Sequence, residues 1–141
     1  MRSFFDTSVL VAAILEEHEN HDRSLLAYSR ANPSHSYCAA HNLAEVYSTL
    51  TGFPGKRRLS PDQALLVLDE IHERLTVLSI GVEEYFATVR KFASMGIVGA
   101  AMYDGLIAGC ALKAKANVLY TLNVRHFMRL GPEIAAIVKA P

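Results

Sequence analysis

Apolar residues recur along the chain in two kinds of segment, short runs bounded by turn residues and longer stretches with helical spacing. The first kind is typical of buried strands and the second of helices packed on a core. Strands are predicted at Phe4–Phe5, Ser36–Ala39, Thr76–Ile80 and Val118–Tyr120, with a last short strand near Ile137. Helices are predicted at Val9–Leu15, around Leu25–Tyr28, at His41–Thr51, after Ser60, at Val82–Met95 and at Ala100–Leu112. This alternation predicts an α/β fold with a mostly parallel central sheet of about four or five strands, flanked by helices.

Length and composition indicate one folded domain spanning residues 1–141. The chain is long enough to bury a core, and its 51% hydrophobic and 20% charged residues are ordinary for a globular protein. Because the formal net charge is zero, nucleic acid would have to be bound by local basic patches. Cys38 and Cys110 lie among apolar residues, and two isolated thiols make a poor zinc site. We expect reduced core cysteines in a cytoplasmic protein, since neither a signal peptide nor a membrane-spanning run is predicted.

The first predicted strand leads directly into an aspartate. Asp6 follows Phe4–Phe5 and precedes the first predicted helix. In open α/β sheets, ligands bind just outside the carboxyl ends of the strands, which is where this residue would lie. An aspartate before a helix is also an ordinary N-cap. Position 6 alone leaves both interpretations open.

Three later polar residues change the weight of these interpretations. Asp104 is the only charged residue in a nearly apolar helix, where a lone buried carboxylate costs several kcal/mol unless it is paired. Glu45 lies off the apolar stripe of its helix and shares a face with His41, although a solvated glutamate is the plain alternative. Asn123 follows a strand, where a turn asparagine is common.

On a parallel sheet, Asp6, Glu45, Asp104 and Asn123 would all open onto the same edge. Three of them are carboxylates, and crowded like charges call for a cation. Ligands that are all oxygen suit magnesium or manganese. The pattern therefore predicts a divalent cation site.

Two charged runs have a structural and a functional interpretation each. Lys56, Arg57 and Arg58 are three consecutive cations in a predicted loop, which either keep the surface soluble or contact phosphates. The segment Glu16–Asp22 contains His18 and His21 among its acids, and we favour a solvated helix end over a metal site.

Four segments, in this order, resemble the motifs of PIN-domain proteins, above all the VapC-type toxins of bacterial toxin–antitoxin pairs. They are Phe4–Leu10, Asn42–Val46, Tyr103–Ala108 and Tyr120–Phe127, and the resemblance extends over nearly the whole chain. It implies a PIN-like three-layer fold. It also implies that Asp6, Glu45 and Asp104 correspond to the three acidic metal ligands of the family. Many members have a fourth acid in the last motif, where this chain has Thr121 and Asn123.

The resemblance implies a metal-dependent endoribonuclease that cleaves RNA by metal-activated water, with Mg²⁺ or Mn²⁺ as cofactor. Asp6 and Asp104 would be direct ligands, and Glu45 would bind through water or deprotonate the nucleophile. Thr7 or Ser8 would support Asp6 or contact phosphate. The residues expected to contact the RNA backbone are Lys56, Arg57, Arg58, Arg125 and His126, with His41 as a weaker candidate.

The resemblance also implies a small antitoxin protein as partner. Apolar helix faces near Leu25, Leu65 and Phe92 exceed what one sheet needs, so we further expect a homodimer that receives an antitoxin segment.

Other functional classes fit the residues less well. A phosphoryl-accepting signalling domain would need paired acids beside its acceptor aspartate and a late lysine, and neither is found. An aspartyl phosphatase would need a second aspartate two residues after the first, where this chain has Ser8. A catalytically silent partner-binding module would have no use for the three acids. A PIN-type nuclease that processes RNA without being a toxin remains open at this point.

Overall fold

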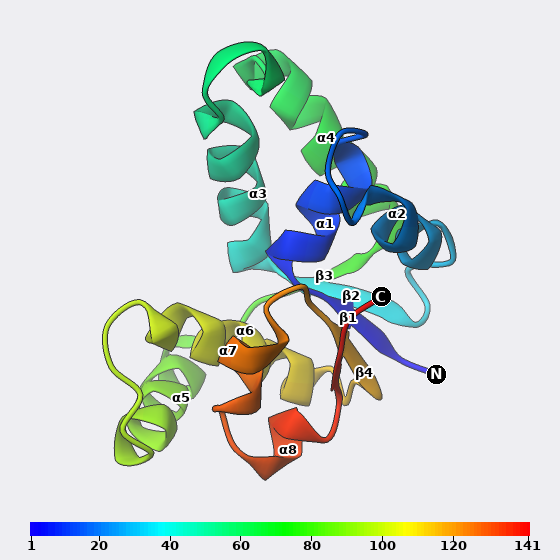
Figure 1. Ribbon diagram of the computed structural model, residues 1–141. Helices are drawn as coiled ribbons and strands as arrows, with labels where there is room; N and C mark the ends of the chain where they lie inside the picture. The colour runs from blue at the N-terminus through cyan, green and yellow to red at the C-terminus, as the bar shows by residue number, and fades with distance from the viewer.

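The centre of the computed structural model, which describes all of residues 1–141, is a five-stranded sheet in the order β3-β2-β1-β4-β5 (Figure 1). Its strands are β1 (Ser3–Phe5), β2 (Ser36–Ala39), β3 (Thr76–Leu78), β4 (Val118–Tyr120) and β5 (Val138–Lys139). All four pairings are parallel, so the carboxyl ends of the strands share one edge. The predicted parallel sheet is confirmed.

Helices cover both faces of this sheet and give the molecule three layers (Figure 1). One face carries α1 (Thr7–Ile14), α2 (His21–Ser29), α3 (Ala40–Gly52) and α4 (Pro61–Arg74). The other carries α5 (Val82–Ser94), α6 (Ala101–Lys113), α7 (Val124–Met128) and α8 (Pro132–Ala135). A short 3₁₀ turn, η1 (Gly55–Arg57), lies between α3 and α4.

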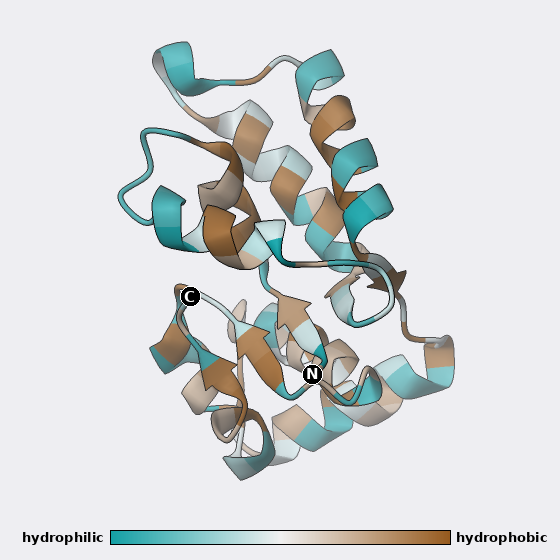
Figure 2. Ribbon diagram, turned by 90° about the vertical axis from the view of Figure 1, so that its right-hand side faces the viewer, coloured by the Kyte–Doolittle hydropathy of each residue, from teal (hydrophilic) through white to brown (hydrophobic).

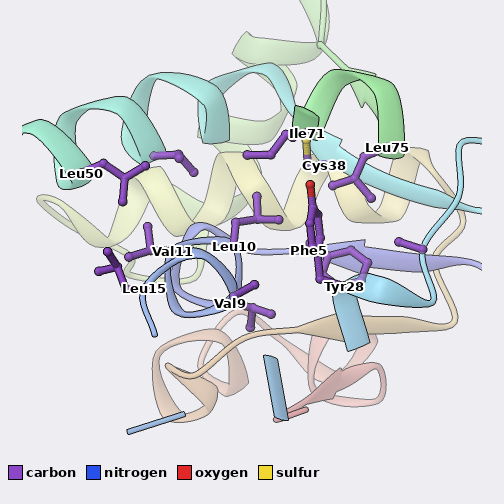
Figure 3. Close-up of a cluster of buried hydrophobic side chains, with 13 residues drawn as sticks. Phe5, Val9, Leu10, Val11, Leu15, Tyr28, Cys38, Leu50, Ile71 and Leu75 are labelled. Atoms are coloured by element: carbon purple, nitrogen blue, oxygen red, sulfur yellow. The ribbon is translucent and has the colours of Figure 1, made fainter. Parts of the chain in front are cut away.

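Two hydrophobic cores form because successive strand residues point to opposite faces of the sheet. Phe5 packs with α1 to α4, in the cluster that also holds Leu10, Cys38 and Ile71 (Figure 3), whereas its neighbour Phe4 packs in the second cluster against α5 to α8. The strands are therefore mainly hydrophobic throughout, while the helices alternate between hydrophobic and hydrophilic positions (Figure 2). A strand buried on both faces needs such a continuous apolar run.

The strand predicted at Thr76–Ile80 is shorter in the structure and ends at Leu78. It is an edge strand whose only neighbour is β2, and its last paired residue, Leu78, lies opposite Ala39, the final residue of β2. Ser79 and Ile80 have no strand beside them, so the ladder cannot continue.

Several apolar residues that the helical pattern assigned to packing faces are exposed. Leu25 and Leu65 belong to this group, as expected for surplus faces on α2 and α4. Phe92 does not, because it is fully buried beneath α6, and the exposed apolar residues of α5 lie on its other positions. These are Val82, Tyr85, Phe86 and Val89. None of the helices has both the length and the apolar character needed to cross a membrane.

Candidate active site

The four polar residues predicted to converge do line one cleft, of about 640 Å³, at the carboxyl edge of the sheet. Asp6 directly follows β1, Asn123 is the third residue after β4, and Glu45 and Asp104 belong to α3 and α6. Each strand delivers its residue to the same edge because the strands are parallel. The structure thus brings together Asp6, Thr7, Ser8, Glu45, Asp104 and Asn123.

Asp6 is buried and is held by two hydroxyl groups. Thr121 Oγ1 and Ser8 Oγ both donate to its Oδ2, at 2.8 Å and 2.9 Å. Although Asp6 occupies the N-cap position of α1, its side chain makes no capping hydrogen bond, so the N-cap interpretation is wrong. Burial raises the pKa of Asp6 from 3.8 to about 6, against the lowering effect of the two hydroxyl groups, and the negative charges of Asp104 and Glu45 raise it further.

Glu45 is positioned by a chain of hydrogen bonds that reaches into the core. Thr7 Oγ1 donates to Glu45 Oε1 at 2.8 Å and accepts from Asn42 Nδ2 at 2.9 Å. Asn42 is fully buried, and its Oδ1 accepts from the backbone amide of Ala39 at 2.8 Å. The sequence analysis includes Asn42 in a motif segment but predicts no role for it. The signal was available, since Asn42 lies on the apolar side of its helix, where an unpaired amide is costly.

Asp104 lies in the first turn of α6 and is half-buried. Burial raises the pKa of Asp104, the side chains of His126 and Arg129 oppose that rise, and Glu45 adds to it. No hydrogen bond or ion pair within the protein satisfies this carboxylate. The sequence analysis did not single out Arg129, because this residue at the end of α7 comes near Asp104 only through the packing of α7 on α6.

Thr121 and Asn123 contribute in different ways. Thr121 is buried, holds Asp6 and accepts the backbone amide of Asn123 at 3.0 Å. Asn123 is exposed, lines the cleft and makes no side-chain capping bond at the start of α7. The hydroxyl therefore supports the first carboxylate, while the amide faces the open cleft.

A comparison with known families matches residues 3–131 to the PIN domain. The chain belongs to the PIN-domain family. It is 32% identical over 135 residues to ribonuclease VapC40 of Mycobacterium tuberculosis, which covers 94% of this chain and 96% of the relative. It is 34% identical over 113 residues to ribonuclease VapC27 of the same organism, which covers 80% and 79%. These relatives place it among the VapC-type members of the family.

Solved structures share the fold of this PIN domain. VapC20 of Mycobacterium tuberculosis, a toxin that cleaves the sarcin–ricin loop, aligns with a TM-score of 0.70 and 14% identity over 88% of this chain and 92% of its own. The VapBC2 complex of Rickettsia felis, bound to a promoter fragment, gives a TM-score of 0.67 and 20% identity over 99% and 98%. At these identities the likeness establishes the architecture.

The basic residues predicted to contact RNA are only partly gathered at the PIN-domain cleft. Arg57 lines it, whereas Lys56 and Arg58 do not, and Arg58 Nε donates instead to the carbonyl of Phe53 at 2.9 Å. His126 lies near enough to Asp104 to oppose the rise in its pKa, and Arg125 is exposed on the same short helix.

The loop after α1 also lines the cleft. His18, Glu19 and Asn20 belong to its wall, although the segment was predicted to be only a solvated helix end. The backbone amide of Asn20 donates to Nδ1 of His18 at 3.0 Å, which keeps that ring nitrogen engaged within the loop. The loop therefore borders the candidate active site without supplying a metal ligand set.

PIN and VapC nucleases are typically metal-dependent, and the donors in this cleft suit a hard cation. Carboxylate and amide oxygens are what Mg²⁺ and Mn²⁺ prefer. The raised pKa values of Asp6 and Asp104 show that the protein alone compensates these charges poorly. No three His, Cys, Asp or Glu side chains lie close enough together to hold an ion at once. The residues fit the cation by chemistry, with fewer than three direct ligands from His, Cys, Asp or Glu side chains in this arrangement.

Proposed function

We propose that this VapC-type protein is an endoribonuclease that hydrolyses RNA with Mg²⁺ or Mn²⁺, and that it is the toxin of a toxin–antitoxin pair. The observation that carries the proposal is the shared cleft of Asp6, Glu45 and Asp104, in which the buried Asp6 carboxylate is held by hydroxyl groups and by no basic side chain. The relatives named ribonucleases VapC40 and VapC27 support RNA as the substrate class.

Asp6 and Asp104 would hold the cation directly, and Glu45 would reach it through water. When bound, such a cation neutralises the crowded carboxylates, orients the scissile phosphate and lowers the pKa of the attacking water. Thr7 would fix Oε1 of Glu45 and leave Oε2 able to accept a proton. Oε2 lies 3.9 Å from Nε2 of His41. Ser8 and Thr121 keep Asp6 in one rotamer, and the Asn123 amide would orient water at the open side.

Arg57 is our choice for the main backbone contact, because it is the member of the basic run that lines the cleft. Arg125 and His126 would contact phosphates on the α7 side. Replacing Arg57 with glutamate should raise KM for RNA about tenfold with little change in kcat, since a phosphate contact binds ground state and transition state alike. Lys56→Glu is the matched control and should have a smaller effect. Equal effects of the two substitutions would mean that only the general charge of the loop matters.

Two exposed apolar surfaces support the expected protein partners. A groove of about 340 Å³ between α1, α2 and α4 is lined by Ile14, Leu25, Tyr28 and Leu66, which suits an apolar segment of an antitoxin. The exposed apolar face of α5 suits a second copy of the chain. The VapBC2 complex of Rickettsia felis shows a relative of this fold with its antitoxin. Free, buried Cys38 and Cys110 are in keeping with a reducing cytoplasm.

The decisive experiment incubates the purified protein with total RNA in Mg²⁺, in Mn²⁺ or in EDTA. We expect cleavage that EDTA abolishes and that Asp104→Asn abolishes in either metal. Asp69→Asn is the matched control, because Asp69 is an exposed aspartate of α4 outside the cleft. Undiminished cleavage in EDTA would refute the metal-dependent mechanism, and undiminished cleavage by Asp104→Asn would refute the site.

Toxicity is tested separately by expression without a partner. Growth should stop with the wild-type protein and continue with Asp6→Asn. Cleavage in vitro without growth arrest would favour the alternative of an RNA-processing PIN nuclease. Absence of cleavage together with tight antitoxin binding would favour a catalytically silent binding module.

A further inference from the structure

Two aromatic rings stack on each other next to the cleft, each beside an acid that lines it. The imidazole of His41 and the phenol ring of Tyr103 lie with their centroids 5.8 Å apart and their planes inclined by only 14°. His41 belongs to α3 and Tyr103 to α6, so the pair joins two helices that each supply an acid to the candidate site. His41 is one helical turn before Glu45, and Tyr103 immediately precedes Asp104.

One face of the Tyr103 ring is not covered by His41 and is free to contact a ligand. His41 covers one of its faces, yet 55% of the residue is exposed, and its hydroxyl group makes no hydrogen bond within the protein. A tyrosine that served only packing would bury its ring and pair its hydroxyl. This one does neither, beside a cleft that we assign to RNA.

The α3 helix extends this surface along the cleft. His41, Glu45 and Thr49 recur every four residues and therefore share a face, and Glu45, Thr49 and Phe53 line the cleft itself. From position 41 to position 53 this face is about 18 Å long, enough for several nucleotides of an extended strand. Arg57 lies beyond its far end. The face thus runs from an aromatic platform, past the acids, to a cation.

We propose that Tyr103, supported by His41, is a stacking platform for the unpaired base next to the scissile phosphate. This inference rests on the ribonuclease function proposed above. Every base has a π-face, so stacking on the free side of Tyr103 would demand an unpaired nucleotide without fixing its identity. Tyr103 is on this account a positioning residue: it holds the strand so that the phosphate lies over Asp6 and Asp104.

The test uses a single-stranded RNA oligonucleotide that contains one cleavage site, chosen by mapping the cuts that the wild-type protein makes in total RNA. KM and kcat are measured for the wild type, Tyr103→Phe and Tyr103→Leu. Tyr47→Leu is the matched control, since Tyr47 is a half-buried tyrosine of α3 that lies two residues from Glu45 and therefore on the opposite side of that helix. Each enzyme is also given oligonucleotides in which the base before or after the cut is replaced by an abasic site.

We expect Tyr103→Phe to stay within about twofold of wild type, and Tyr103→Leu to raise KM by roughly 10- to 100-fold with a far smaller change in kcat. One abasic position should cost the wild type a similar factor and cost Tyr103→Leu nothing more, because the partner of the missing base is already gone. Tyr47→Leu should keep the full abasic penalty. Melting curves of all variants show whether each is folded.

Two results would overturn the platform. In the first, Tyr103→Leu cleaves with an unchanged KM. In the second, the abasic and Tyr103→Leu penalties multiply, which would mean that the base and the ring do not meet. Both leave the proposed function intact, because the wild type still cleaves and Asp104→Asn does not. A wild type that fails to cleave any RNA would instead overturn the proposed function, and the platform with it.

Discussion

Asp6→Asn is the substitution that most directly tests how the site is built. It removes a buried negative charge and keeps the shape of the side chain. The amide oxygen of asparagine can still accept from Thr121 and Ser8, the two donors that hold the carboxylate at 2.8 Å and 2.9 Å. What changes is the free-energy cost of burying an ionised carboxylate, which no cation offsets in the metal-free protein.

The size of that cost follows from the pKa of Asp6, which rises from 3.8 to about 6 on folding. The folded state therefore binds the proton more tightly than the unfolded chain. Below the unfolded pKa the group has no effect; its destabilisation grows as the pH rises and saturates above the folded pKa. From the linkage relation, the difference is about 3 kcal/mol at pH 7.5, about half of that at pH 5 and near zero at pH 3.

The assay is thermal unfolding of the wild type and Asp6→Asn in EDTA from pH 3 to pH 8. The buried amide group left by asparagine adds a cost that does not depend on pH, so the informative quantity is how the stability difference changes with pH. We expect the unfolding free energy of Asp6→Asn, relative to that of the wild type, to rise by about 3 kcal/mol between pH 3 and pH 7.5. This corresponds to roughly 9 °C in Tm for a domain of this size. Asp69→Asn, an exposed control, should show no such gain.

A stability difference that stays flat with pH would refute the argument, because it would mean that Asp6 titrates alike in the folded and unfolded states. Added Mg²⁺ gives a second check. It should stabilise the wild type by about 2.7 kcal/mol at a concentration 100 times its Kd, and Asp6→Asn by much less. Equal stabilisation of both proteins would mean that Mg²⁺ binds elsewhere.

Two further substitutions test the support of the site and the packing beneath it. Asn42→Ala should lower the unfolding free energy by about 1–3 kcal/mol, because it leaves buried groups unpaired, and should lower kcat about tenfold by releasing Thr7; a lower Tm with unchanged kcat would contradict its positioning role. Gly105→Ala should lower stability by about 1 kcal/mol, since a Cβ would lie 2.9 Å from the buried ring of Phe92 and overpacking outweighs the helix propensity of alanine. Gly52→Ala, with nothing within 4 Å, is its control, and denaturant unfolding that showed both variants stabilised would contradict the expected clash.

The layered fold could be predicted because its strands are buried on both faces. Phe4 and Phe5 are adjacent, and each is needed in a different core, so the apolar run identifies a central strand without any knowledge of its partners. The end of β3 could not be predicted in the same way. Ser79 and Ile80 are acceptable strand residues, and only the length of the neighbouring β2 stops the ladder at Leu78. Strand ends depend on the partner strand, which the local pattern does not contain.

The acids of the site and the support of Asp6 by Ser8 could be predicted from the sequence, whereas which acids Thr7 and Thr121 hold could not. A charge inside an apolar helix, such as Asp104, is conspicuous in one dimension. Threonine, serine and asparagine are ordinary anywhere, and Thr121 acquires its role only because β4 lies beside β1 in the sheet. The pairing of strands 115 residues apart in the chain decides which hydroxyl group meets which carboxylate.

The groups around each acid also decide how far its pKa is shifted. Two hydroxyl groups stabilise ionised Asp6, yet they replace only part of the water that burial removes, so its pKa still rises. Asp104 has no such donors and is instead near His126 and Arg129. Burial is the larger cause of the raised pKa for both residues, and mutual repulsion is the smaller one, contrary to what crowding alone would predict.

If repulsion between the acids were the main cause, moving the acids apart would relieve it. A site that relies on burial is relieved only by a proton or by a cation that enters it, and the first of these is scarce at neutral pH. At neutral pH the cation that we propose would therefore be a better partner for Asp6 than a proton.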